Sequence, residues 1–192
     1  MRFFALALVC GIGLGYAHRG SLRGLANVPA RLFLVLWAAL TLQLTLARVP
    51  ADDAGVPLRL VLVLVSYALA GAGLGWYAAR SRGQLPGLSL LALGWFLNVL
   101  VITANAGMPV SRHAVLRSGL EWTDVREGSL FKHVPAGSHT SLRFLGDVIP
   151  VPGLHRVVSL GDIVLLLGIV SFVAQAMSAP RTRVLARAAQ QP

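Results

Sequence analysis

The sequence is poor in charged residues, and in acidic ones above all. Charged residues make up 12% of the 192 residues, and Asp and Glu together number seven. A soluble domain carries about 25% charged residues, so water is not the main solvent of this chain. The hydrophobic share of 56% and the mean hydropathy of +0.71 indicate an integral membrane protein instead.

Cysteine is nearly absent as well. The chain has one cysteine, Cys10, and this excludes an intrachain disulfide. Cys10 lies within an apolar run, and Val9 before it is not the small residue that a lipoprotein signal needs there. We therefore interpret Cys10 as a small buried hydrophobe.

The net charge of +10 does not indicate a nucleic-acid-binding protein. The basic residues flank apolar runs, and the sequence has no patch that combines basic and aromatic residues. Anionic lipid and the positive-inside rule explain this pattern better. The lipid bilayer is therefore the expected partner, and nucleic acid is not.

Five apolar runs are candidate transmembrane spans, each of which needs about 20 mostly apolar residues. They cover residues 3–17, 32–47, 58–79, 85–104 and 160–177. We predict an all-α membrane protein with one membrane domain, residues 1–179, and a disordered basic cytoplasmic tail, residues 180–192. The first run could instead be a cleaved signal peptide. Arg19, Arg23 and Arg31 follow it directly and oppose export, which favours an uncleaved span.

The short loops predict the orientation of the spans. The loops after the first and third runs carry basic residues without acidic ones, namely Arg19, Arg23, Arg31, Arg80 and Arg82. The loop after the second run has Arg48 and Arg59 beside Asp52 and Asp53. By the positive-inside rule the N-terminus lies outside and the C-terminus in the cytoplasm. Residues 105–159 then form a long extracytoplasmic loop between the fourth and fifth spans.

A faint repeat links the front half of the chain. Gly11-Ile-Gly-Leu-Gly-Tyr16 and Gly71-Ala-Gly-Leu-Gly-Trp76 each precede a short basic loop and an apolar helix. The pattern predicts two similar helical hairpins followed by a final helix. Gly11 with Gly15, and Gly71 with Gly75, are pairs of small residues four apart, which let helix backbones approach closely. Contacts within the chain and self-association both remain open.

Amide side chains in or beside the second and fourth predicted spans are further candidates for contacts between helices. They are Gln43, Asn98 and Asn105. Asn98 and Asn105 are seven residues apart and share one helix face. Hydrogen bonds between helices are the favoured role, at about 0.6 kcal/mol each. A polar lining for a transport path is the alternative.

The long loop contains two further patterns. Ser111 is placed to cap a short helix that runs to about Ser118, with Gly119 as its stop. Residues 142–152 are apolar but too short to span a bilayer, and they contain two prolines. That stretch suits an interfacial or re-entrant segment.

Asp162 is the first candidate for chemistry, because carboxylates near membrane depth are rare. Ser159-Leu-Gly-Asp162 also has the spacing of a capping box, in which Ser159 caps the last helix and Asp162 accepts from its first turn. Structural capping is therefore the favoured role of this pair. A ligand-binding or catalytic role for Asp162 is the alternative.

Asp147 and His133 are the other candidates. Asp147 and Asp162, if held close, could share a proton and act as acid and base. With His133 they could also bind a divalent cation. The spacing of His133 and His139 matches no zinc motif, and proline and glycine lie between them. We therefore predict no metal and no cofactor, and Asp147, Asp162 and His133 remain candidates without an assigned catalytic role.

Several stretches of the chain together match the pattern of a known family. They are Asn98–Val110, Lys132-His133, Leu145–Pro152 and Val158–Asp162 in the second half, and Leu40–Gln43 with the arginine-rich first inner loop in the front half. Together they resemble a bacterial family of small integral membrane proteins classed only as a domain of unknown function. The resemblance covers about residues 3–177, and this chain has Ala106 where the family tends to have a second glycine. It implies a multi-pass protein of the bacterial plasma membrane and no particular activity.

Three functions follow from these observations. The favoured one is a non-enzymatic accessory or interaction subunit of the cell envelope, in contact with another membrane protein or with itself. The second is a membrane enzyme or ion-binding protein that uses Asp147, Asp162 and His133 at the outer interface. The third is a small oligomeric transporter with a polar path past Gln43 and Asn98.

Overall fold

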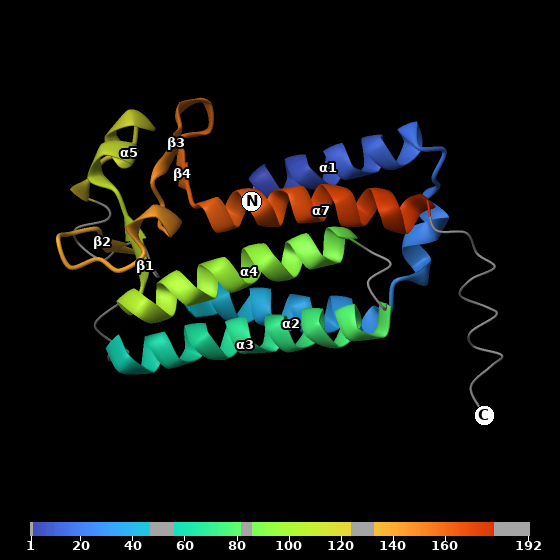
Figure 1. Cartoon of the computed structure of the whole chain (residues 1–192), viewed down its shortest axis with the longest axis horizontal. Helices are drawn as coiled ribbons and strands as arrows, with labels where there is room; N and C mark the ends of the chain where they lie inside the picture. Colours follow the sequence, from blue (N-terminus) through green and yellow to red (C-terminus); the bar gives the residue numbers. More distant parts are fainter. Residues whose placement is uncertain (1, 47–55, 82–85, 124–132, 179–192) are drawn as a thin grey trace.

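The computed structural model describes residues 2–46, 56–81, 86–123 and 133–178, so the predicted tail at 180–192 lies outside the described part. Five long helices form a bundle (Figure 1). They are α1 (Arg2–Ala17), α2 (Ala30–Leu46), α3 (Val56–Ser81), α4 (Pro86–Asn105) and α7 (Leu160–Ser178). Each of the five apolar runs is thus a helix.

Successive helices of the bundle run in opposite directions (Figure 1). The described residues between α4 and α7, 106–123 and 133–159, therefore lie at the end of the bundle from which α1 starts. We call the described part of this stretch the end module. The 3-10 helix η1 (Leu22–Asn27) lies at the opposite end, where α7 finishes.

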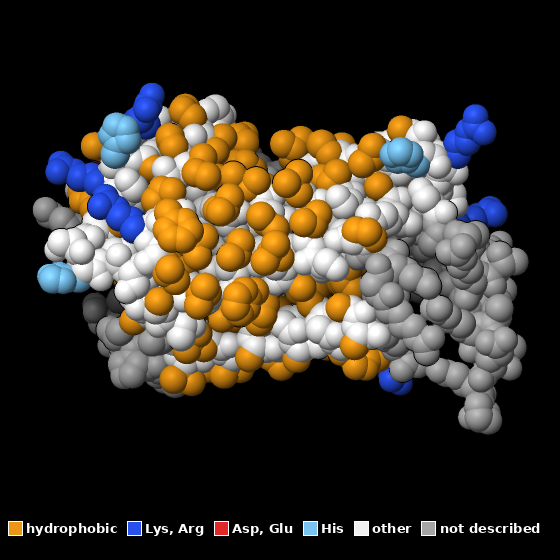
Figure 2. Space-filling model, viewed as in Figure 1, with side chains coloured by type: hydrophobic (Ala, Val, Ile, Leu, Met, Phe, Trp, Pro, Cys, Tyr) orange, Lys and Arg blue, Asp and Glu red, His pale blue; other side chains and the backbone are white. Residues whose placement is uncertain are grey.

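Three of the helices are long and apolar enough to cross a membrane. The segments are Val61–Ala79 in α3, Pro86–Asn105 in α4 and Leu160–Ser178 in α7, while the apolar segments Phe3–Ala17 and Ala30–Ala39 are shorter. On the face that Figure 2 shows, apolar side chains cover the middle and arginine side chains lie toward the two ends. This distribution is compatible with a membrane protein that has three candidate spans.

The helices do not pack as the two similar hairpins that the sequence predicts. α3 contacts α4, but α1 packs against α7 and α2 packs against α3. The reason lies in η1, which rests directly on the end of α7 at Ala176 and Met177 before α2 begins. Because α1 is covered on one side only, Cys10 is exposed rather than buried as predicted.

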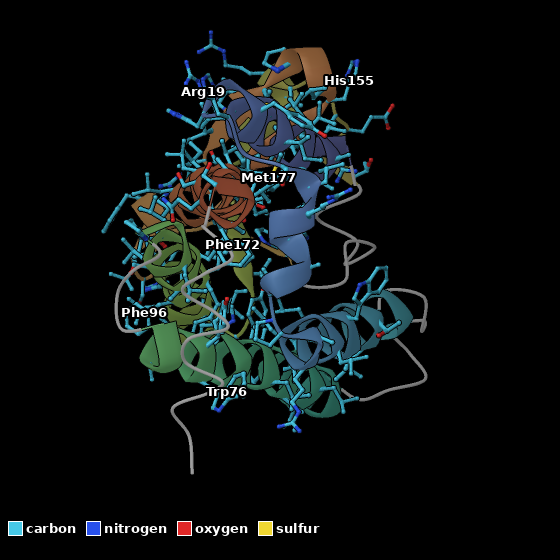
Figure 3. All side chains as sticks on the ribbon, turned by 90° about the vertical axis from the view of Figure 1, so that its right-hand side faces the viewer. Arg19, Trp76, Phe96, His155, Phe172 and Met177 are labelled. Carbon is cyan, nitrogen blue, oxygen red and sulfur yellow. The ribbon has the colours of Figure 1, made fainter. Side chains whose placement is uncertain are left out.

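α7 lies between α1 and α4, as the view along the bundle shows (Figure 3). Phe172 points into the bundle and packs edge-to-face on Tyr77, with ring centroids 6.3 Å apart. Phe96 and Trp76 are exposed on the outside of the bundle. One core cluster therefore joins α7 to α2, α3 and α4.

The end module contains strands, so the chain is mostly helical rather than all-α. Its elements are β1 (Met108–Val110), α5 (Arg112–Arg117), β2 (His133–Pro135), the 3-10 helix η2 (Arg143–Leu145), β3 (Ile149–Val151), the 3-10 helix η3 (Pro152–Leu154) and β4 (Arg156–Val158). β1 pairs with β2 in parallel, and β3 pairs with β4 antiparallel. Strands of three residues, most with an internal or terminal proline, are too short to show an alternating pattern in the sequence.

Candidate functional site

Hydrogen bonds of the Asn105 side chain join α4 to the end module. Its Nδ2 donates to the carbonyl oxygens of Val101 (2.8 Å) and Ser141 (2.9 Å), and its Oδ1 accepts from Ser141 N over 2.9 Å. The helix itself ends in a Schellman motif, in which Gly107 N donates to Ile102 O and Ala106 adopts a left-handed conformation (φ 53°). Asn105 thus fixes the module to the last turn of α4.

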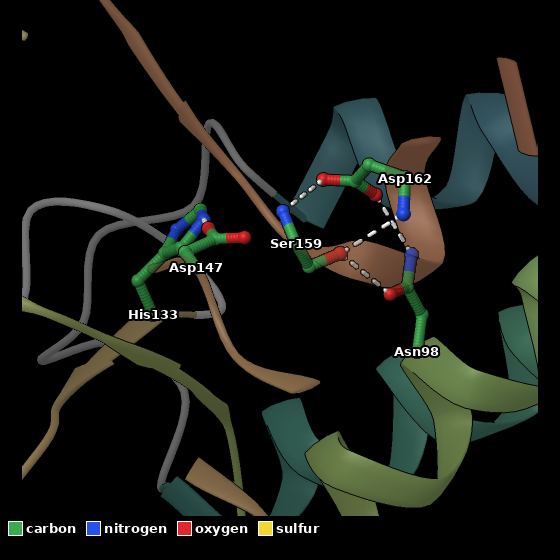
Figure 4. A network of polar contacts seen from close by, with 5 residues as sticks. All are labelled: Asn98, His133, Asp147, Ser159 and Asp162. Atoms are coloured by element: carbon green, nitrogen blue, oxygen red, sulfur yellow. Dashed lines mark hydrogen bonds and ion pairs between the residues drawn. The ribbon is translucent and has the colours of Figure 1, made fainter. Parts of the chain in front are cut away.

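A second polar cluster joins α4 to the start of α7 (Figure 4). Asn98 Nδ2 donates to Asp162 Oδ1 (2.8 Å), and Ser159 Oγ donates to Asn98 Oδ1 (2.9 Å). Asp162 N donates to Ser159 Oγ (3.0 Å), and Ser159 N donates to Asp162 Oδ2 (3.3 Å). The last two bonds are those of a capping box. We call this group the Asn98 ring, and every side-chain oxygen in it has a partner.

The third polar contact lies inside the end module, where His133 Nε2 is 3.1 Å from Asp147 Oδ2. The register of the strands brings the two residues together across β1. His133 pairs with Met108 on one side of β1, and Asp147 forms a parallel bridge with Val110 on the other. Residues paired in a parallel ladder project to the same face, so both side chains reach across β1.

This pair differs from the Asn98 ring because it is incompletely satisfied. The side chain of Asp147 is 7% exposed and that of His133 23% exposed. Asp147 Oδ1 and His133 Nδ1 are buried and have no hydrogen-bond partner among the described residues. A buried polar group without a partner costs about 1–3 kcal/mol, which marks the pair as a candidate binding site.

The two candidate carboxylates lie at the same end of the bundle but do not bind each other. Asp162 accepts from Asn98 and Ser159, whereas Asp147 contacts His133 (Figure 4). Proton sharing requires two carboxyl groups in direct contact, so this arrangement does not form an aspartyl dyad. His139 is exposed, and no group of three or more His, Cys, Asp or Glu side chains that could hold a metal ion occurs among the described residues.

Three of the four predicted packing glycines lie against a neighbouring helix, and the fourth does not. A Cβ added at Gly11 would lie 2.9 Å from Val173 Cβ, one at Gly15 would lie 2.5 Å from Met177 Sδ, and one at Gly71 would overlap the ring of Trp95. Gly75 faces open space.

Gln43 lies in α2, and its side chain is outside the described part.

Sequence reasoning missed a set of close glycine contacts between α4 and α7. Added Cβ atoms would lie 2.5 Å from Leu165 N at Gly94 and 2.6 Å from Leu91 N at Gly168, and at Gly161 the atom would overlap the Asn98 amide. The available signal was a seven-residue spacing, because Gly87 and Gly94 on α4, and Gly161 and Gly168 on α7, each share one helix face.

The fold and these contacts define a mostly helical protein with candidate membrane spans and a polar module at one end. The chain belongs to DUF5317, a family of unknown function whose model matches residues 27–174. The match includes every residue of the Asn98 ring and of the His133–Asp147 pair. The resemblance to a family of unknown function is thereby confirmed. No curated protein and no solved structure matches the chain.

Proposed function

We propose that the chain is a multi-pass protein of the bacterial plasma membrane, with five spans, the N-terminus outside and the C-terminus in the cytoplasm. α1 and α2, with 16 and 17 residues, are about 24 and 26 Å long. They lie along α7 and α3, which contain candidate spans, and expose apolar side chains such as Phe4 and Trp37. Arg19 and Arg23 are exposed in the short connection between α1 and α2, and short loops decide the orientation under the positive-inside rule.

Cysteine labelling distinguishes a topology with five spans from one with three. In a Cys10→Ser background, single cysteines at Arg23 and His139 are treated with a membrane-impermeant maleimide in spheroplasts. If α2, α3 and α4 all cross the membrane, the two positions lie on opposite sides, and only the one at 139 reacts before permeabilisation. Reaction of both positions in intact spheroplasts would place them on one side and contradict the five-span topology.

The function that the geometry supports best is that of a non-enzymatic accessory subunit, which presents the end module to a partner protein. The observation that carries this proposal is the outer face of α5. Arg112, His113, Leu116 and Arg117 are exposed on it, while Ala114 and Val115 are buried against the module. A basic face around one exposed leucine fits an acidic protein surface with an apolar contact point.

Affinity purification from native membranes in mild detergent, followed by quantitative mass spectrometry, tests this role. The comparison is between the wild type, Arg112→Glu with Arg117→Glu, and a control with Ser138→Glu and His139→Glu. We expect a stoichiometric partner that the α5 variant loses and the control keeps. Equal recovery from all three proteins, or no partner with the wild type, would count against the accessory role.

The His133–Asp147 pair supports a second function, an ion-binding or catalytic site. If His133 Nε2 carries the proton donated to Asp147 Oδ2, both unpartnered atoms are electron-pair donors. Their missing partner would then be a cation or a hydrogen-bond donor. Metal analysis of purified wild type and Asp147→Asn tests this idea. It fails if Asp147→Asn combined with Asp162→Asn folds and functions as the wild type does.

The transporter hypothesis has less support. It requires free polar groups along a path past Gln43 and Asn98. Asn98 is buried, its oxygen accepts from Ser159 and its nitrogen donates to Asp162. A side chain held in this way favours helix packing over a role in conduction.

A further inference from the structure

The 3-10 helix η2 exposes an apolar and a basic side chain at the junction of bundle and module. Phe144 is 67% exposed, an exposure that among the described large hydrophobic side chains is matched only by Leu34. Arg143 beside it is exposed as well, whereas Leu145 is buried at 5% exposure. Burial of this ring against an apolar partner would be favourable, because it would remove apolar surface from water.

The depth of η2 follows from its contacts with α4. Asn105, the last residue of the candidate span Pro86–Asn105, binds the backbone of Ser141 through both atoms of its amide. Leu145 packs in one cluster with Val101 and Ile102, one turn before the end of that span. η2 is therefore level with the last turn of α4, where the hydrocarbon core of a bilayer would give way to headgroups.

The backbone holds Phe144 in this position from both sides. Leu142 takes a left-handed conformation (φ 50°) directly after the Asn105 contact. Asp147 N donates to Pro109 O over 2.8 Å, and an added Cβ at Gly146 would lie 2.5 Å from the same oxygen. The exposure of Phe144 is therefore imposed by fixed flanking contacts.

We propose that η2 is a phospholipid-binding anchor, in which Phe144 inserts at the edge of the acyl chains and Arg143 binds a headgroup phosphate. The inference rests on the proposed membrane location. Interfacial segments bury Trp, Phe and Leu side chains at the boundary of headgroups and acyl chains, and a guanidinium matches the geometry of a phosphate.

Spin-label accessibility in nanodiscs tests the depth of Phe144. The full chain in a Cys10→Ser background carries one label, at Phe144→Cys, at Phe96→Cys as the bundle reference, or at His139→Cys as the water reference. We expect oxygen to collide more often than a polar nickel reagent with the labels at 96 and 144, and the reverse at 139. A label at 144 that behaves like the one at 139, while 96 reports lipid, overturns the anchor and leaves the membrane location intact. If 96 also reports water, the membrane location fails and the anchor with it.

The role of Arg143 has its own readout. Native mass spectrometry of protein released from phosphatidylglycerol nanodiscs counts the phospholipids that remain bound. We expect Arg143→Gln to retain several-fold less phospholipid than the wild type, because the charge-assisted phosphate contact is gone. Arg156→Gln, which removes an exposed arginine from β4, is expected to retain the wild-type amount. Equal retention by Arg143→Gln and the wild type overturns the assignment of Arg143.

Discussion

Asn98 Nδ2 donates a hydrogen bond to Asp162 Oδ1 over 2.8 Å, and this contact joins α4 to the first turn of α7. The same carboxylate accepts from Ser159 N, so one side chain both caps α7 and binds its neighbouring helix. Gly161 makes the approach possible, because any side chain there would overlap the Asn98 amide. Structural use of Asp162 therefore accounts for the carboxylate at the start of this apolar helix.

Replacing Asn98 tests the value of this ring. We expect Asn98→Leu to lower the free energy of unfolding by about 1–3 kcal/mol, since it leaves Asp162 Oδ1 without a donor and the Ser159 hydroxyl without its acceptor. This exceeds the average of about 0.6 kcal/mol for polar contacts between membrane helices. Unfolding in sodium dodecyl sulfate, followed by circular dichroism, measures it. Thr103→Val, on an exposed site of the same helix, is the control and should stay within about 0.5 kcal/mol. Equal stability of the two variants would contradict the role of the ring.

Replacement of glycine by alanine should have opposite effects at Gly94 in α4, which contacts α7, and at Gly75 in α3, which faces open space. Gly94→Ala places a methyl group 2.5 Å from Leu165 N, and such overpacking costs about 1–3 kcal/mol. Gly75→Ala meets nothing within 4 Å and should gain up to about 1 kcal/mol from helix propensity. The same unfolding measurement compares the two. A destabilised Gly75→Ala would instead indicate that Gly75 lies in a contact between protomers.

Ala106 occupies a position that favours glycine. Its left-handed conformation costs an L-residue about 1–2 kcal/mol, and glycine loses about 0.5–1 kcal/mol more backbone entropy on folding. We therefore expect Ala106→Gly to raise the free energy of unfolding by about 0.5–1 kcal/mol. Ala104→Gly, two residues earlier and inside α4, should lower it by about the same amount. The prediction fails if both substitutions change stability in the same direction.

The two carboxylates should respond differently to loss of charge. Asp162→Asn leaves one acceptor for two donors and removes a favourable charge from the start of a helix, so we expect a loss of about 1–3 kcal/mol. Asp147→Asn keeps an oxygen for His133 and removes a charge whose other oxygen has no partner. We expect a change within about 1 kcal/mol, because these effects offset each other. A larger loss for Asp147→Asn than for Asp162→Asn would show that Asp147 is structural.

Parts of the site could be predicted because they depend on residues close in sequence. The capping box needs only Ser159 and Asp162, three positions apart. The short helix α5 lies between Ser111 and Gly119 as predicted, but the Ser111 side chain makes no capping hydrogen bond. The pairing of His133 with Asp147 could not be predicted in the same way. It depends on the three-residue strand β2 and on an isolated bridge at Asp147, which pair with opposite sides of β1. Such pairings leave no periodic signal.

The sequence by itself determined that this chain forms apolar helices, and approximately where each begins and ends. Helix formation depends on local hydrogen bonds and on the length of apolar runs, which are both readable along the chain. Only the tertiary structure decided that α1 packs on α7, and that α7 lies between α1 and α4. Apolar helices are nearly interchangeable as partners in lipid. Their pairing is therefore selected by close contacts such as Gly94 with Leu165, and by hydrogen bonds such as Asn98 with Asp162.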